Sequence, residues 1–142
     1  ISRTMSKAFA FAGARLGYLA ADEAAVDALR LVRLPYHLSA LTQAAATAAL
    51  KHSDAMLAMV DDIRTQRDRI ILELTEMGLS PYRSDANFVL FGGLENSNAV
   101  FQNLLAAGVL VRDVGIPGTL RVTAGTVSET SGFLTALKAA IS

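Results

Sequence analysis

One long segment, residues 53–77, constrains the fold more than any other part of the sequence. It contains neither Gly nor Pro, and its apolar residues recur near the spacing of one helical face. We therefore predict a helix from Ser53 through Met77, ended by Gly78. Four charged residues are expected on its solvent-facing side: Arg64, Arg67, Asp68 and Glu73.

Short apolar segments alternate with helical ones on both sides of this helix. Asp22 and Ser39 are expected to cap helices before it, and Thr126 with Glu129 forms a capping-box pair that starts the last helix. Such alternation indicates an α/β or α+β class, with the long helix as the joint between two domains. The predicted strands are residues 1–4, 15–21 (expected to be buried), 87–93, 109–114 and 119–125.

The composition excludes several classes of function. Thirteen basic residues balance thirteen acidic ones, so no net field draws the chain to nucleic acid or an anionic membrane. With 52% hydrophobic residues the chain can bury a core, yet no apolar run is long enough for a membrane helix. The absence of Cys excludes disulfides and fits a cytoplasmic protein, and two His residues make a metal site unexpected.

The first residue is Ile, and no leader with a cleavage site follows it. The segment ISRT has the character of a core strand without partner strands. We therefore expect a C-terminal fragment of a longer protein.

Lys7 lies in SKAFAFAGARLGY, a segment of apolar and small residues whose next cation is Arg15. If it is turned inward, Lys7 is partly desolvated, which favours the neutral amine that a Schiff base requires. The hydroxyls of Thr4 and Ser6 and the Arg15 guanidinium together suit a phosphate group. Gly13 would let the backbone approach it. On spacing alone, a surface lysine remains the alternative reading.

The stretch RTMSKAFAFAGARLGYLAA resembles the lysine segment of fold-type I pyridoxal-phosphate enzymes of the aminotransferase family. The resemblance implies that Lys7 holds pyridoxal 5'-phosphate as a Schiff base and that Arg15 binds the cofactor phosphate. It also implies Ser6 and Thr4 as hydroxyl donors to that phosphate, Thr4 being the weaker assignment.

Two further stretches, SDANFVLF and GVLVRDVGIPGTLRVTAGT, resemble the small domain of the histidinol-phosphate aminotransferase subfamily. This resemblance implies that Arg121 is the main clamp for the substrate anion and that Arg112 adds a phosphate contact. A salt bridge with Asp113 or another surface acid is the alternative role for Arg112. Asn87 either binds substrate, orients Arg121 or is only a turn residue.

The same resemblance implies the domain organisation. Residues 1–52 would be the end of the large cofactor-binding domain, residues 53–78 the connecting helix and residues 79–142 the small C-terminal domain. It also implies a homodimer.

The implied reaction is transamination of L-histidinol phosphate with 2-oxoglutarate, giving imidazole-acetol phosphate and glutamate in histidine biosynthesis. Lys7 would act as both anchor and base, and the fragment alone would be nearly inactive. An aromatic amino-acid aminotransferase, a threonine-phosphate decarboxylase and a non-catalytic assembly module remain alternatives.

Overall fold

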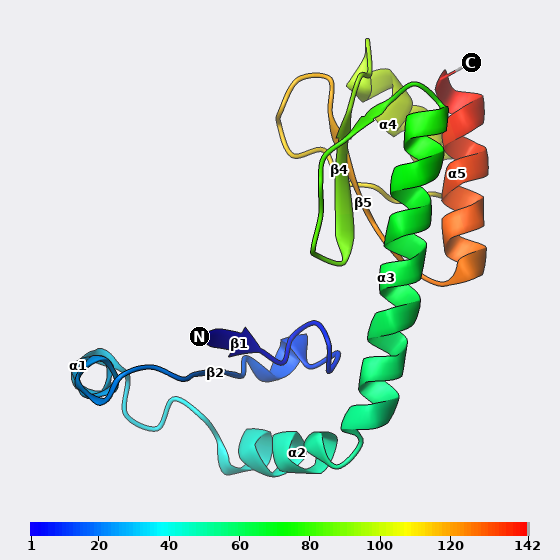
Figure 1. Cartoon of the computed structure of the whole chain (residues 1–142). Coiled ribbons are helices and arrows are strands. Elements are labelled where there is room, and N and C mark those ends of the chain that lie inside the picture. Colours follow the sequence, from blue (N-terminus) through cyan, green and yellow to red (C-terminus); the bar gives the residue numbers. More distant parts are fainter. Residues whose placement is uncertain (142) are drawn as a thin grey trace. The chain divides into compact units, whose positions relative to one another are not determined.

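The structure is a computed structural model that describes residues 1–141. The chain divides into two compact units, Ile1–Val60 and Asp61–Ser142. Helix α3 (Ser53–Glu76) contributes residues to both units (Figure 1). Helices and short sheets occur in each unit, which confirms the mixed α/β class.

The first unit begins with an antiparallel pair of strands, β1 (Ser2–Thr4) and β2 (Gly17–Leu19). A loop containing the 3-10 helix η1 (Ala12–Ala14) joins them. Two helices follow, α1 (Glu23–Val32) and α2 (Ala40–Leu50). The unit is therefore a small strand pair followed by separate helices.

The predicted caps of α1 and α2 are confirmed. The Asp22 carboxylate accepts a hydrogen bond from the amide of Ala24 at 3.0 Å, and the Ser39 hydroxyl accepts one from the amide of Thr42 at 3.0 Å. Each side chain pairs an amide that the first helical turn leaves without a backbone acceptor.

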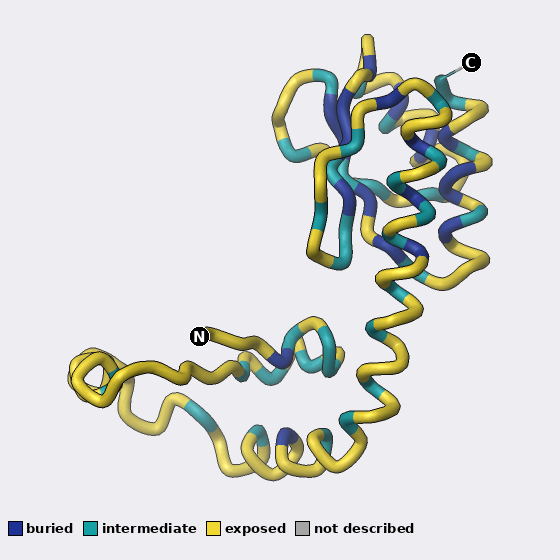
Figure 2. Tube along the Cα trace, in the orientation of Figure 1, coloured by how far each residue is buried: buried dark blue, intermediate teal, exposed yellow. Residues whose placement is uncertain are grey.

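The prediction that residues 15–21 form a buried strand is wrong in its burial. All three residues of β2 are exposed, with Tyr18 at 62% and Leu19 at 44% of their full accessible area. Figure 2 shows that exposed residues dominate the first unit, where Met5 and Ala46 are the buried residues among those described. The two-stranded sheet is too small to cover its own apolar side chains.

The second unit contains a three-stranded antiparallel sheet in the order β3 (Ser80–Pro81), β4 (Phe88–Gly92), β5 (Leu120–Thr123). Helix α4 (Ser97–Ala106) follows β4, and α5 (Val127–Ile141) follows β5. Within this unit, α3 and α5 run along the sheet (Figure 1).

One continuous hydrophobic core joins the sheet to the three helices. Residues 89 and 91 of β4 and residues 120 and 122 of β5 alternate inward, as the two-residue period of a strand requires. The Phe91 and Phe133 rings meet edge to face with centroids 6.2 Å apart. The fully buried side chains include Ile70, Leu74, Val89, Phe91, Leu104, Leu120 and Leu137.

The long helix is confirmed, and it ends where Gly78 takes a positive φ of 78°. One charged residue departs from the prediction. Arg67 was expected in solvent, yet its side chain is only 11% exposed. Its spacing from Ile63, Ile70 and Leu74 puts it in the row of residues that faces the core.

The predicted strand over residues 109–114 is also corrected. Within the described chain this segment forms only an isolated bridge, in which Arg112 pairs with Arg121. The reason lies in the turn that follows, because the Asp113 carboxylate accepts a hydrogen bond from the Gly115 amide at 2.8 Å. This local turn bends the chain away after one paired residue.

We expect Leu104→Ala to destabilise the second unit by roughly 2–5 kcal/mol, because Leu104 is fully buried and its removal leaves a cavity. Its neighbour Leu105 is 44% exposed, so Leu105→Ala should change stability by about 0.5 kcal/mol or less. Urea unfolding of the two variants measures the difference. Equal losses would contradict the core described above.

The capping box makes a second prediction. Glu129 accepts hydrogen bonds from the amide and hydroxyl of Thr126 at 2.7 and 2.8 Å, and these bonds lower the pKa of its carboxyl. A carboxyl with a lowered pKa in the folded state stabilises the fold above its unfolded pKa. That stabilisation is lost as the pH falls through the folded value.

Glu129→Gln should therefore unfold at lower urea concentration than wild type at pH 7, and the gap should close in acid. Glu95→Gln, at an exposed position, is the control and should leave the pH profile unchanged. A gap that stays constant down to pH 2 would argue against a role for the Glu129 charge.

Candidate functional site

The loop between β1 and β2 carries Lys7. Hydrogen bonds between backbone groups close this loop: the Met5 amide donates to Leu16 O at 3.1 Å and the Phe11 amide donates to Met5 O at 3.1 Å. The Ala10 amide donates to Lys7 O at 2.9 Å, so Lys7 opens a tight turn. The backbone at Lys7 is thus fixed by its own loop.

Two hydroxyls lie together at the start of this loop. Thr4 Oγ1 and Ser6 Oγ are 2.8 Å apart, and Thr4 Oγ1 also accepts a hydrogen bond from the Ser6 amide at 3.1 Å. The structure therefore brings together two of the side chains that the sequence assigned to a phosphate. Both sit immediately before Lys7 in the chain.

Arg15 occupies the other end of the loop in a left-handed conformation, with φ at 52°. A non-Gly residue rarely adopts this conformation. Its Nη1 donates a hydrogen bond to Ala12 O at 2.9 Å, which leaves the other guanidinium donors available to a ligand.

Lys7 is exposed in the described chain, so the condition for its desolvation, a side chain turned inward, does not hold there. The neighbours Ala8 and Phe9 are themselves only partly buried, so they place few atoms around the amine. The described residues of this unit therefore do not bury the Lys7 amine.

The second group of site residues lies in the other unit, on the sheet. Arg112 and Arg121 exchange two backbone hydrogen bonds, amide to carbonyl in each direction at 2.8 Å. Residues that pair in this way project their side chains on the same face of the sheet. Two cations directly opposite each other repel, and an anion between them would relieve that repulsion.

Arg121 is supported by an aromatic ring. Its Cζ lies 4.6 Å from the centroid of Phe88, two residues along β4 from Leu90, its strand partner. A guanidinium over a ring face is attracted to it and loses freedom to rotate. The Nε of Arg121 is buried and has no hydrogen-bond partner within residues 1–141.

An unpaired buried donor is costly unless something accepts from it. Across the described residues, neither Arg112 nor Arg121 forms an ion pair, so the alternative salt bridge between Arg112 and Asp113 is absent there. The pair is chemically suited to a bidentate anion such as a phosphate or a carboxylate.

Asn87 is half-buried at the start of β4, where its carbonyl accepts a hydrogen bond from the Ala124 amide at 2.9 Å. Ala124 lies two residues after buried Val122 and therefore on the same face of the sheet. Its pairing with Asn87 puts Asn87 on this helix-facing side as well. Arg121 projects from the opposite side. A role for Asn87 toward a substrate stays a prediction.

Phe88 is a neighbour of the candidate site that was not predicted from the sequence. The alternation of a strand puts Phe88 on the same face as Leu90. That this face also carries Arg121 became known only with the register of β4 and β5.

No group of three or more His, Cys, Asp or Glu side chains suited to a metal ion occurs in residues 1–141. Nor does any helix over the same residues have the length and apolar character needed to cross a membrane.

The sequence model for the family "Aminotransferase class I and II" matches residues 1–137. The chain belongs to this family.

Among curated proteins, the chain is 66% identical to the histidinol-phosphate aminotransferase of Paenarthrobacter aurescens over 139 residues. That match covers 98% of this chain and 37% of the relative. It is 62% identical to the histidinol-phosphate aminotransferase of Mycolicibacterium smegmatis, with 96% and 36% covered. The chain thus spans little more than a third of the length of these relatives.

Solved structures agree with the fold. The histidinol-phosphate aminotransferase of Sinorhizobium meliloti, solved in complex with pyridoxal-5'-phosphate, matches with a TM-score of 0.82 and 31% identity, covering 99% of this chain and 40% of that one. The enzyme of the same name from Clostridium acetobutylicum matches with a TM-score of 0.81 and 25% identity, covering 98% and 44%. The expected fold-type I aminotransferase class is confirmed.

The Lys7 loop depends on a close approach between its flanking strands. A Cβ on Gly17 would lie 2.6 Å from Arg3 O, whereas a Cβ on Gly13 would meet nothing within 4 Å. We expect Gly17→Ala to separate β1 from β2 and to speed hydrogen exchange of the Met5 amide by at least about tenfold. Gly13→Ala is the matched control and should leave that rate unchanged. Equal exchange in both variants would contradict the pairing.

Proposed function

We propose that this chain is the C-terminal part of a pyridoxal-phosphate-dependent aminotransferase that converts L-histidinol phosphate and 2-oxoglutarate to imidazole-acetol phosphate and glutamate. The observation that carries the proposal is the 66% identity to a relative named histidinol-phosphate aminotransferase, which extends over nearly the whole chain. The directly opposed Arg112 and Arg121, neither of which forms an ion pair within the described residues, support it chemically.

The residues of the Lys7 loop fit the cofactor. Thr4 and Ser6 present hydroxyls 2.8 Å apart, and Arg15 retains guanidinium donors, which is a donor set suited to a phosphate. Lys7 follows Ser6 directly and offers an exposed primary amine. Pyridoxal phosphate, when bound, supplies an electron sink for negative charge on the substrate carbon.

Lys7 has two roles in this proposal. Its Nζ anchors the cofactor between turnovers. Once the donor amine had displaced it, the released Nζ would be the base that accepts the proton from the substrate carbon and would then donate that proton to the carbon of the cofactor. The short hydrogen-bonded turn that begins at Lys7 keeps its backbone fixed while the side chain moves.

Arg121 and Arg112 share the substrate anion. Histidinol phosphate has no carboxylate, so its phosphate must occupy the place that the carboxylate of glutamate takes in the other half-reaction. Arg121, held against Phe88, is the main clamp for both anions. Arg112 adds a second positive charge that balances the greater negative charge of the phosphate.

The same proposal includes the wider organisation of the protein. Residues 1–52 belong to the large cofactor domain, residues 53–78 to the connecting helix and residues 79–142 to the small domain. We further propose a cytoplasmic homodimer that acts in histidine biosynthesis, on the basis of the family resemblance.

The first test uses the full-length protein that carries this chain, loaded with pyridoxal phosphate. Adding histidinol phosphate should change the cofactor absorption faster than adding phenylalanine does. Lys7→Ala should abolish the change for both donors. A faster response to phenylalanine would favour an aromatic aminotransferase, release of carbon dioxide from threonine phosphate would favour the decarboxylase, and no response to any amine would favour an assembly module.

Within the same assay, Arg112→Gln should weaken the use of histidinol phosphate by roughly 10- to 100-fold, the equivalent of a hydrogen bond to a charged group. Its effect on glutamate should be smaller. Arg83→Gln, on an arginine whose side chain is 90% exposed, is the control. Equal effects of Arg112→Gln on both donors would contradict a dedicated phosphate contact.

A further inference from the structure

The exposed face of the β4–β5 pair carries a further polar side chain near the two arginines. Thr123 lies two residues after Arg121 on β5, so both side chains project on the same face of the sheet. The burial of β5 alternates accordingly, because Leu120 and Val122 are buried whereas Thr123 is exposed. Within residues 1–141 the Thr123 hydroxyl forms no hydrogen bond, so the fold of this part of the chain does not use it.

The strand register places Thr123 directly opposite Phe88. Arg121 uses its amide and carbonyl to bond Arg112, so its pairing with Leu90 on the other side of β5 is of the kind without mutual hydrogen bonds. Pairs of one kind recur at every second residue of an antiparallel ladder, so Thr123 and Phe88 form such a pair as well. Side chains approach most closely in these pairs, whose Cα atoms are about 4.5 Å apart.

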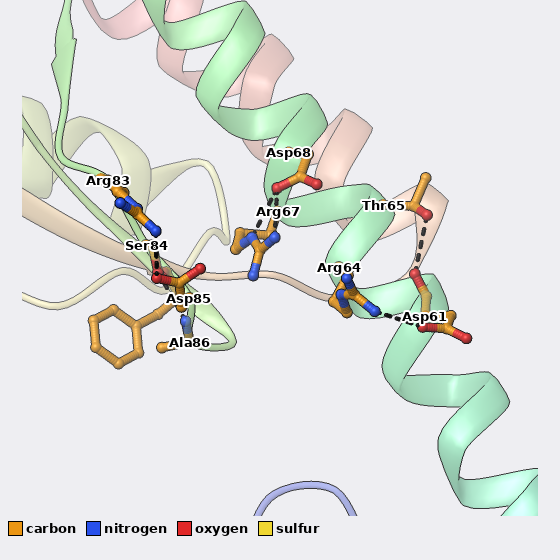
Figure 3. A network of polar contacts seen from close by, with 10 residues as sticks. Asp61, Arg64, Thr65, Arg67, Asp68, Arg83, Ser84, Asp85 and Ala86 are labelled. Carbon is orange, nitrogen blue, oxygen red and sulfur yellow. Dashed lines mark hydrogen bonds and ion pairs between the residues drawn. The ribbon is translucent and has the colours of Figure 1, made fainter.

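Phe88 connects Thr123 to Arg121, the proposed anion clamp. The Cζ of Arg121 lies 4.6 Å from the centroid of the Phe88 ring. The turn before β4 fixes the backbone of Phe88, because the Ser84 hydroxyl donates to Phe88 O and accepts from the Ala86 amide (Figure 3). The residue that supports the guanidinium is therefore also the residue that Thr123 faces across the strands.

A phosphate offers more acceptor oxygens to this face than a carboxylate does. An arginine fork donates to two oxygens of an anion, which uses both oxygens of a carboxylate. A phosphate monoester has three terminal oxygens, so it can accept from a donor beyond the fork. Arg112 lies beside β5 on the edge away from β4, whereas Thr123 lies on β5 itself, opposite Phe88.

We propose that the Thr123 hydroxyl donates a hydrogen bond to the substrate phosphate held by Arg121 and thereby favours a phosphate over a carboxylate in this place. The inference rests on the proposed function, because it adds a specificity-determining residue to that same anion site. A β-branched side chain has restricted χ1, so the direction of the hydroxyl is largely fixed before the substrate binds. Arg112 adds charge, and Thr123 adds a short uncharged donor.

The test compares Thr123→Val with Thr123→Ser in the full-length protein loaded with pyridoxal phosphate. Valine replaces the hydroxyl by a methyl group at nearly the same shape, whereas serine keeps the hydroxyl. In Thr123→Val we expect kcat/KM for histidinol phosphate to fall roughly 10- to 100-fold, as loss of a hydrogen bond to a charged group predicts, and kcat/KM for glutamate to stay within about threefold. Thr123→Ser should keep nearly wild-type values for both donors.

Thr135→Val is the matched control, because it makes the same change at an exposed threonine on α5. It should change the kinetics with neither donor. Three results would overturn the proposal: no change in Thr123→Val, an equal loss with both donors, or an equal loss in Thr123→Val and Thr123→Ser. The last result would assign Thr123 to packing against Phe88.

Thr123→Ala removes the same hydroxyl and gives the same comparison if Thr123→Val does not fold. Failure of both variants to fold would overturn the proposal in favour of a structural role.

The wild-type protein distinguishes this inference from the function on which it rests. If the wild type does not use histidinol phosphate, the proposed function fails and the role of Thr123 fails with it. If the wild type uses histidinol phosphate and Thr123→Val keeps the same preference for it over glutamate, only the inference about Thr123 fails.

Discussion

The pairing of β4 with β5 is the interaction on which the second unit depends. Its register sends Val89, Phe91, Leu120 and Val122 toward the helices, where they are buried. The two-residue period of a strand then requires the residues between them to project on the other face. The buried core and the outward projection of Arg121 are thus two consequences of one register, and a slip by one residue would exchange the two faces.

The two units differ in the interactions that stabilise them among the described residues. The second unit buries a continuous core and satisfies its helix ends with local caps. The first unit is held mainly by the backbone bonds of its strand pair and loop, and large apolar side chains such as Leu31 and Leu34 remain 87% and 75% exposed. Its candidate cofactor residues are therefore fixed by main-chain geometry rather than by packing.

Local signals in the sequence predicted much of this fold. The caps at Asp22 and Ser39, the capping box at Glu129 and the stop at Gly78 each depend on a few neighbouring residues, so they could be identified before any tertiary contact was known. Burial could not be predicted from these local signals, because it depends on which distant residues pack against a side chain. For this reason the predictions for residues 15–21 and for Arg67 were wrong about solvent exposure, although both predicted elements formed.

For the candidate site, Thr4 and Ser6 were predicted from the sequence, and the structure brings their hydroxyls together. Arg112 and Arg121 were nominated through a family resemblance, and the structure adds that they are direct cross-strand partners. Phe88 needed the strand register to be identified as their neighbour. Sequence patterns thus predict candidate reactive side chains. The residues that hold those side chains in place are identified only from the pairing of distant segments.

Across residues 1–141, Arg112 and Arg121 are joined through their main-chain amides and carbonyls alone. Main-chain bonds of this kind form with almost any side chain, so the bridge carries no requirement for arginine at residue 112. The charge presented beside Arg121 can therefore be exchanged without rebuilding the sheet. A scaffold of this kind allows the side chain at residue 112 to change by a single substitution while the fold stays the same.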